Sequence, residues 1–204
     1  MDGLKGLTVI SFLAACTILI TGCGTVETPP PGMAVKPKVR PLVDRREVPS
    51  RLTLPRVNVV PNKWRYIVVH HSATPAGSAR AFDEFHRNKR GWDRGLGYHF
   101  VIGNGNGSGN GLVETGHRWT RQIDGAHAGS AQYNQHGIGI CLVGDFEVGN
   151  PTGKQMGSLV ELVKELQRIC NIPSENVILH RHMRDTQCPG SGFPYYELLA
   201  RLPR

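Results

Sequence analysis

From residue 62 onward, the chain alternates short apolar segments with longer polar or amphipathic ones. The short apolar segments predict strands, and they cover residues 64–72, 97–102, 112–115, 137–144 and 177–179. The segment 137–144 is apolar at almost every position, which is typical of a central strand covered on both faces.

Apolar residues at helical spacing predict three helices between or after these strands. Ser78 is a suitable N-cap for a helix over residues 79–89, and Thr152 is a suitable N-cap for a long amphipathic helix. Pro173 is expected to end that long helix, and residues 193–202 predict a short last one. Because strands alternate with helices, the sequence predicts an α/β fold: a single domain with a central mixed β-sheet flanked by helices on both faces.

Two polar stretches interrupt this pattern. Residues 104–111 consist of Asn, Gly and one Ser, and they predict a mobile hairpin tip. A phosphate-binding loop is not expected there, since no lysine and no helix start follow the glycines. Residues 116–135 predict a long polar loop of the kind that carries binding chemistry.

Residues 1–22 have the pattern of a bacterial lipoprotein signal peptide. Residues 7–20 are nearly all apolar but too short for a comfortable membrane span. They lead into the sequence Ile-Thr-Gly-Cys at residues 20–23, which resembles a signal for cleavage before Cys23 and its lipidation. The alternatives are an ordinary secretory signal or a helix that stays in the membrane. No aspartate follows the cysteine, so we expect outer-membrane anchoring that faces the periplasm if the cell is Gram-negative.

Residues 23–61 predict a linker that leads into a domain over residues 62–204. Prolines recur along it, which favours an extended and semi-rigid chain. Between residues 24 and 61, seven basic side chains face three acidic ones. A solvated spacer is the simpler interpretation, and adhesion of the basic stretch to anionic lipid or wall polymer is the other.

Composition indicates which classes of binding partner the chain is expected to have. The chain has 204 residues, 39% of them hydrophobic, and a net charge of +8 that attracts polyanions. We find no motif of a nucleic-acid-binding module, and nucleic acid is therefore not an expected partner. The five cysteines do not form a regular disulfide framework. Cys141 and Cys170 are expected to be unpaired, partly because one lies in an apolar strand.

Metal-ligating residue types follow two of the predicted strands. His180 comes directly after the strand 177–179, and Cys188 returns eight residues later. A second apolar run ends in His70 and His71. Because side chains alternate between the two faces of a strand, only one of these two histidines can point toward the metal. Two imidazoles and a thiolate suit Zn²⁺, and three protein ligands leave a fourth position for water, as in a catalytic site. His182 is an alternative ligand.

Five motifs in this order resemble the type 2 zinc-dependent N-acetylmuramoyl-L-alanine amidases, the class of phage amidase-lysozymes and peptidoglycan recognition proteins. They are Val-His-His-Ser-Ala-Thr at residues 69–74, Gly-Tyr-His-Phe at 97–100, His-Ala-Gly at 127–129, Ile-Gly-Ile-Cys-Leu-Val-Gly at 138–144, and His180 with Thr-Gln-Cys-Pro-Gly at 186–190. The resemblance covers about residues 62–203 and implies a zinc amidase domain.

The resemblance also implies roles for individual residues. It makes His70, His180 and Cys188 the zinc ligands, with His71 pointing away or supporting them. Tyr98 would act at the reacting centre together with Thr186, which stands where the phage enzymes have lysine and therefore adds no positive charge. The residues expected to contact substrate are His127, Asn134, His99 and Trp92.

The expected function is zinc-dependent hydrolysis of the amide bond between N-acetylmuramic acid and L-alanine in peptidoglycan. A different class of function is a non-catalytic, peptidoglycan-binding envelope lipoprotein that lacks hydrolysis. A polyanion-binding module driven by the positive charge is a third. We expect a monomer whose partners are peptidoglycan or muropeptides and the membrane.

Overall fold

The computed structural model describes residues 52–203. The predicted signal peptide, the lipidation site Cys23 and most of the predicted linker lie outside these residues. Within the described part, no helix has both the length and the apolar character needed to cross a membrane.

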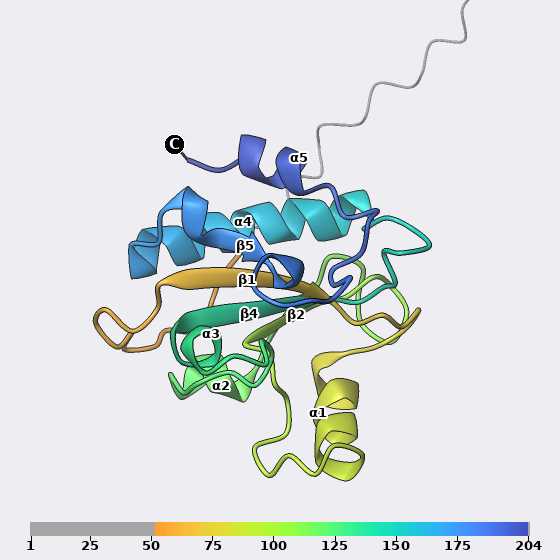
Figure 1. Cartoon of the computed structure of the whole chain (residues 1–204), viewed down its shortest axis with the longest axis horizontal. Helices are drawn as coiled ribbons and strands as arrows, with labels where there is room; N and C mark the ends of the chain where they lie inside the picture. The colour runs from red at the N-terminus through yellow and green to blue at the C-terminus, as the bar shows by residue number, and fades with distance from the viewer. Residues whose placement is uncertain (1–51, 204) are drawn as a thin grey trace, which may run out of the picture. The chain divides into compact units, whose positions relative to one another are not determined.

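A five-stranded mixed sheet forms the centre of the domain (Figure 1). Its order is β3-β2-β4-β1-β5, in which β4 pairs in parallel with β1 and β2, β1 pairs in parallel with β5, and β3 runs antiparallel to β2. The strands are β1 (Tyr66–His71), β2 (Phe100–Ile102), β3 (Val113–Thr115), β4 (Gly137–Leu142) and β5 (Val177–Leu179). This arrangement confirms the predicted α/β class and the mixed sheet.

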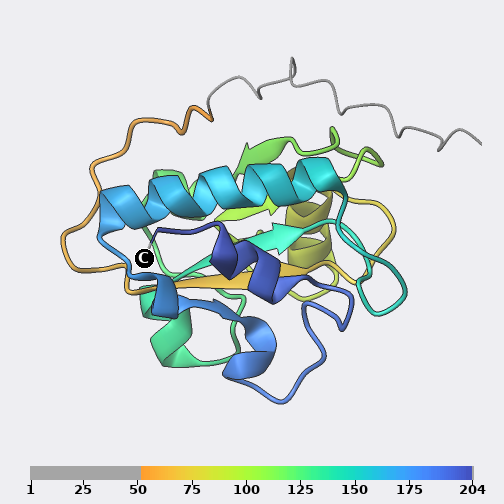
Figure 2. The same cartoon turned by 90° about the horizontal axis from the view of Figure 1, so that it is seen from above.

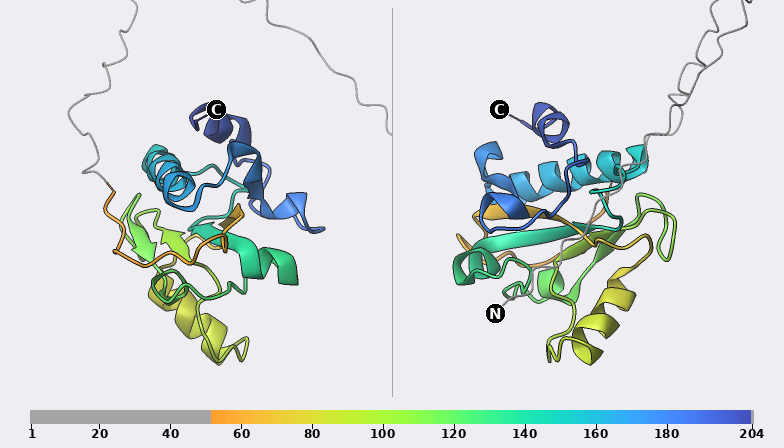
Figure 3. Two further views of the ribbon diagram at one scale, coloured as in Figure 1. Left: turned by 90° about the vertical axis from the view of Figure 1, so that its left-hand side faces the viewer. Right: turned by 45° about the vertical axis from the view of Figure 1, so that its right-hand side comes forward.

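Helices lie on both sides of the sheet (Figures 1 and 3). They are α1 (Ala79–Asn88), α2 (His117–Thr120), α3 (Ala131–His136), α4 (Gly153–Cys170) and α5 (Tyr195–Ala200), with short 3-10 turns η1 (Ser174–Asn176) and η2 (His180–His182). Helix α4 crosses one face (Figure 2), with α5 on its side, whereas α1, α2 and α3 lie on the other.

The pleat of the strands divides the core into two clusters. Alternate residues such as Val69 and Ile140 are fully buried in the larger cluster, which includes the apolar stripe of α4. Their neighbours, such as Cys141, face the opposite side and join a smaller cluster that includes Phe82 of α1. This alternation sends His70 to the face opposite the large core, next to Cys141 of β4 in the parallel register.

Local capping explains where the helices begin and end. Thr152 forms a capping box with Gln155, and the side chain of Ser78 accepts a hydrogen bond from the backbone of Ala81, as expected for N-caps. The end of α4 differs from the prediction. Asn171 adopts the left-handed conformation with φ of 55° and caps the helix, so the helix ends before Pro173 can stop it.

Two predictions for the connecting segments need correction. The stretch 116–135 is not a continuous loop, because it contains α2 and most of α3. The glycine-rich tip 104–111 is held by hydrogen bonds and is not a free hairpin end. Gly77 donates its N–H to the carbonyl of Asn106 at 3.0 Å, and Ser158 of α4 donates to the carbonyl of Gly111 at 2.6 Å.

The last part of the predicted linker also belongs to the domain. Leu52, Leu54, Val57 and Val59 are partly buried against the large core cluster. The packed domain therefore starts at or before Leu52 and not at residue 62. Proline density indicated an extended chain, but it did not show that the alternate apolar side chains of this extended segment pack on the core.

Candidate metal centre and active site

The predicted ligands meet at the carboxyl-terminal ends of two neighbouring parallel strands. The register pairs Val69 of β1 with Leu179 of β5, so His70 and His180, the next residues, emerge side by side. Their ring centroids are 4.5 Å apart. The loop after η2 then brings Cys188 to the same point, with its Sγ 3.7 Å from Nδ1 of His70.

These three side chains have the geometry of a metal site. One ligand atom from each of His70, His180 and Cys188 lies within 4.8 Å of the other two. Among the described residues, these three form the cluster of histidine, cysteine or carboxylate side chains that could hold a metal ion. In a tetrahedral zinc site with metal–nitrogen bonds of about 2.0–2.1 Å and a metal–sulfur bond of about 2.3 Å, nitrogen and sulfur are roughly 3.6 Å apart. The 3.7 Å separation of His70 and Cys188 matches this value.

Hydrogen bonds orient both imidazoles toward this centre. Nε2 of His180 lies 3.3 Å from the carbonyl oxygen of Ala128, which can only accept, so Nε2 carries the proton. Nε2 of His70 lies 3.0 Å from Nδ1 of His127. When both Nε2 atoms are protonated, each Nδ1 keeps a lone pair for a metal ion, which is how metal-ligating histidines are usually held.

The electrostatics keep both imidazoles in the neutral form that binds a metal, whereas burial opposes ionisation of the thiol. Burial, followed by the neighbouring His127 and His180, holds the pKa of His70 well below its usual range, and burial lowers the pKa of His180. Both rings are therefore neutral near pH 7. Burial raises the pKa of the Cys188 thiol to about 11, while the N–H of His71, which donates to Sγ at 3.4 Å, acts in the opposite direction. A bound cation would make the thiolate the stable form.

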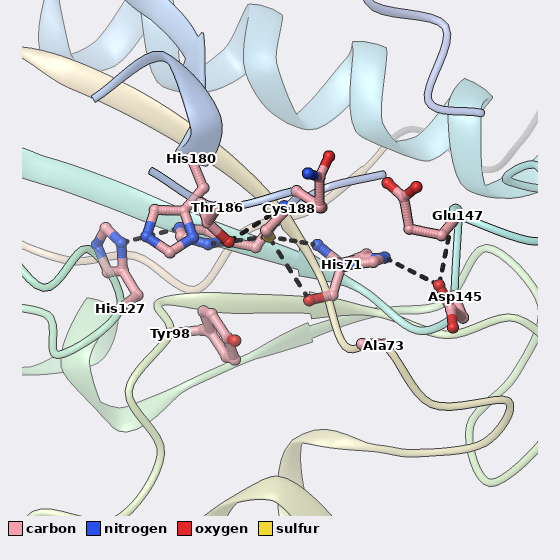
Figure 4. A pocket seen from close by; sticks show the side chains of 11 residues that line it. His71, Ala73, Tyr98, His127, Asp145, Glu147, His180, Thr186 and Cys188 are labelled. Atoms are coloured by element: carbon pink, nitrogen blue, oxygen red, sulfur yellow. Dashed lines mark hydrogen bonds and ion pairs between the residues drawn. The ribbon is translucent and has the colours of Figure 1, made fainter. Parts of the chain in front are cut away.

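The three side chains line an open cavity of about 410 Å³ (Figure 4). His180, Cys188 and His127 gather at one end of it, and Asp145 and Glu147 stand at the other. The remaining lining residues are His70, His71, Ala73, Tyr98, Thr186 and Gln187. The cavity therefore gives a reactant access to the candidate metal centre.

The two predicted catalytic residues both lie in this cavity. The ring of Tyr98 is 5.3 Å from that of His70, and burial, followed by the nearby thiols of Cys141 and Cys188, raises the pKa of its phenol well above the usual value. Tyr98 is therefore a neutral hydrogen-bond donor at pH 7. The hydroxyl oxygen of Thr186 accepts from the backbone N–H of Cys188 at 3.3 Å, which leaves its own proton free to donate.

Two of the predicted substrate contacts, His99 and Asn134, do not line the cavity. His99 is fully buried, its Nδ1 accepts from the N–H of Gly139, and its Nε2 donates to the carbonyl of Ile123. It therefore has no nitrogen for a substrate, and its predicted role is wrong. The side-chain oxygen of Asn134 accepts from the N–H groups of both His127 and Ala128 at 2.9 Å, so it shapes a loop and does not line the cavity.

Trp92 is not among the residues that line the cavity; it is partly exposed, and its ring stacks on His86 with centroids 4.7 Å apart. A substrate contact by Trp92 stays a prediction. His127 lines the cavity, but both its ring nitrogens are engaged by protein atoms.

The remaining histidines and cysteines agree with the simpler interpretations. The ring of His71 points away from the ligands, and its Nδ1 accepts from the N–H of Phe146 at 3.1 Å. His182 accepts from the N–H of Leu179 and packs on Tyr195, so it is not a ligand. Cys141 and Cys170 are free thiols.

Sequence reasoning missed Asp145 and Glu147. They follow β4, whose carboxyl end lies at the same edge of the sheet as the ends of β1 and β5. Because parallel strands deliver the residues that follow them to one edge, the position of Asp145 after the predicted central strand was a usable signal.

Comparisons with known proteins agree with this geometry. The profile of the family described as N-acetylmuramoyl-L-alanine amidase matches residues 60–191. Peptidoglycan-recognition protein LB of Drosophila melanogaster is 33% identical over 135 residues, which are 61% of this chain and 54% of that protein. N-acetylmuramoyl-L-alanine amidase of Sus scrofa is 25% identical over 151 residues, which are 68% of this chain but 23% of that protein. The chain thus spans about half of the first relative and about a quarter of the second.

Solved structures share the fold. The amidase LysC from Clostridium intestinale superposes with a TM-score of 0.59 at 30% identity, over 72% of this chain and 97% of that one. A point mutant of Drosophila PGRP-LB in complex with tracheal cytotoxin superposes with a TM-score of 0.56 at 28% identity, over 73% of this chain and 89% of that one. Fold, motif order and a family profile that spans most of the described domain together show that the chain belongs to the type 2 N-acetylmuramoyl-L-alanine amidase family.

Proposed function

We propose that this protein is a zinc-dependent amidase that hydrolyses the bond between N-acetylmuramic acid and L-alanine in peptidoglycan. The convergence of His70, His180 and Cys188 within 4.8 Å, at the end of an open cavity, carries this proposal. A purely structural zinc site is closed by four protein ligands, whereas three ligands beside a cavity are typical of a catalytic one. The relatives named as amidases support the same activity.

The metal ligands, Tyr98 and Thr186 each have a task in this reaction. Zinc, when bound, would polarise the scissile carbonyl and make water nucleophilic near neutral pH. Tyr98 stays protonated, and its phenol can donate a hydrogen bond to the oxygen that becomes negative as the amide is attacked. The hydroxyl of Thr186 accepts from the backbone N–H of Cys188 and lines the same cavity, so its proton supplies a second, uncharged donor.

The substrate proposal rests on the chemistry of the cavity and on a relative. A point mutant of PGRP-LB has been solved with tracheal cytotoxin, and in another structure with this fold the compound is described as monomeric diaminopimelic acid-type peptidoglycan. An open cavity beside the metal centre suits one end of a branched glycopeptide better than a small, enclosed ligand. We therefore assign peptidoglycan or its muropeptide fragments as the substrate class.

The proposed location is the cell envelope. Lipidation at Cys23 would anchor the mature chain to a membrane, and several acyl chains on one residue give stable attachment. The basic linker would then let the monomeric domain reach the wall. In a Gram-negative cell, the location would be the outer membrane, facing the periplasm.

A digestion experiment tests the function. Purified sacculi are incubated with the full-length protein, and the products are identified by mass spectrometry. We expect release of free stem peptides, and we expect no release with a zinc chelator or with the Cys188→Ala variant. Cys170→Ala removes a thiol at the end of α4 and is the matched control, which should release peptides normally. Binding of sacculi without release by the native protein would instead identify a non-catalytic peptidoglycan-binding protein, the alternative function.

A further inference from the structure

His127 is a buried imidazole that the proposed reaction does not use. It lies in the loop between α2 and α3, and its side chain contacts His70 with ring centroids 4.9 Å apart. It makes no ligand contact of its own with the candidate metal centre, since the cluster of ligand atoms comprises His70, His180 and Cys188. His127 therefore contacts a candidate ligand without being a ligand itself.

A backbone carbonyl determines the direction of the hydrogen bonds in this part of the site. Nε2 of His127 lies 3.1 Å from the carbonyl oxygen of Gly137, at the start of β4. Because a carbonyl can only accept, Nε2 of His127 must carry a proton, and Nδ1 of the neutral ring must accept. The donor to Nδ1 is Nε2 of His70 at 3.0 Å.

This direction has one consequence for the metal centre. A neutral imidazole holds one ring proton, so a proton on Nε2 of His70 leaves Nδ1 with a free lone pair. That Nδ1 is the atom that lies 3.7 Å from Sγ of Cys188. The opposite tautomer of His70 would place a proton toward the thiol and the other ligand, where it would exclude a cation.

The surroundings hold the ring of His127 in this orientation. An added Cβ on either Gly125 or Gly139 would come within 2.4 Å of the imidazole carbon Cδ2, so glycine at both positions lets the ring fit between them. Asn134 accepts from the N–H groups of His127 and Ala128, which fixes the loop that carries the ring. The next residue, Ala128, accepts at its carbonyl from His180, so one short loop orients both histidine ligands.

We propose that His127 is a positioning residue. The Gly137 carbonyl keeps the ring proton of His127 on Nε2, so Nδ1 of His127 accepts from Nε2 of His70. This hydrogen bond leaves Nδ1 of His70 free to bind zinc. This inference rests on the proposed zinc amidase function, but it concerns metal affinity and not the hydrolytic step. Both ring nitrogens of His127 are engaged by protein atoms, and a contact between this cavity-lining ring and a substrate stays a prediction.

Two variants of the full-length protein separate the hydrogen bond from the packing. His127→Phe keeps a planar ring but removes the acceptor, whereas His127→Asn can place an amide oxygen near the position of Nδ1. Zinc affinity is measured by competition with a chromophoric chelator. Loss of such an outer hydrogen bond typically weakens metal binding by about 10–100-fold, so we expect that loss for His127→Phe and recovery of most of the affinity in His127→Asn. His117→Asn, which alters a histidine remote from the ligands, should bind zinc like the native protein.

A measurement on the native protein does not depend on how the variants fold. Nitrogen-15 NMR of the metal-free protein should show both His70 and His127 protonated at Nε2, with Nδ1 of each unprotonated. The opposite tautomer at His70 overturns the proposal, as does native zinc affinity in His127→Phe. Equal weakening in both His127 variants also overturns it, because packing would then be the cause. Failure of the native protein itself to bind zinc would refute the proposed function and this inference together, whereas tight native binding with an unaffected His127→Phe refutes this inference alone.

Discussion

Nδ1 of His70 lies 3.7 Å from Sγ of Cys188, although 118 positions separate the two residues in the chain. The backbone supports this contact, since the N–H of His71 donates to the same sulfur at 3.4 Å. The end of β1 therefore provides both a neighbouring ligand and a hydrogen bond that stabilises a thiolate. A metal ion bound between them would connect two distant parts of the fold, and this connection makes zinc binding measurable as stability.

Zinc should raise the thermal stability of the native protein, and Cys188→Ser should abolish the effect. A ligand that binds only the folded state adds about 4 kcal/mol when its free concentration is roughly a thousand times Kd. For a domain of this size, that corresponds to a rise in Tm of roughly 8–16 °C. Differential scanning calorimetry with and without zinc measures it, and Cys170→Ser serves as the control that keeps the full shift. An equal shift in Cys188→Ser would remove Cys188 from the ligand set.

Tyr98→Phe should lower kcat and leave zinc affinity unchanged. The substitution keeps the ring, which packs near His70, and removes the phenolic proton that we expect to stabilise the developing negative charge. Loss of one such donor or proton carrier typically costs about 10²-fold in rate. Release of stem peptides followed over time gives kcat, and a chelator competition gives the zinc Kd. A parallel loss of zinc affinity would instead indicate that Tyr98 holds the ligands in place.

The metal-free protein should lose stability as the pH falls below about 6.5. Burial holds the pKa of His99 well below its usual range and lowers the pKa of His127 to about 4. As the pH falls, the unfolded chain binds protons at these histidines before the folded chain does. Proton binding therefore favours the unfolded state, and the free energy of unfolding is highest above about pH 6.5 and decreases toward pH 4.

Urea unfolding of the chelator-treated protein at several pH values measures this dependence. The free energy of unfolding should fall steadily between neutral pH and pH 4.5, with net proton uptake on unfolding. A free energy that stays constant or rises over this interval would contradict neutral buried histidines.

Removal of residues 1–61 should destabilise the domain more than removal of residues 1–45. Only the shorter chain lacks Leu52, Leu54, Val57 and Val59, which pack on the core cluster that contains α4. Because these side chains are partly buried, their loss should lower the free energy of unfolding by about 2–4 kcal/mol. Urea midpoints of the two truncated proteins give the difference. Equal urea midpoints would show that residues 46–61 do not stabilise the domain, and its boundary would then lie at residue 62.

Much of the fold was predictable because local patterns agree with tertiary structure. The strand 177–179 matches β5, and Ser78 and Thr152 cap the helices that their positions predict. These features depend on residues close in sequence: apolar runs, capping side chains and helical spacing. The ends of elements were less accurate, as the left-handed Asn171 shows, because several residues near a helix end can stop it.

The sequence by itself determined which residue types could bind a metal and in what order the strands would carry them. Only the tertiary structure decided the pairing of β1 with β5 that brings His70 beside His180, since strand order depends on contacts between residues far apart in the chain. It also separated the roles of similar side chains: His99 became a buried structural ring, whereas His127 became a partner of a ligand. The physical reason is that the role of an imidazole depends on which donor or acceptor meets each of its two nitrogens, and those partners come from other strands and loops.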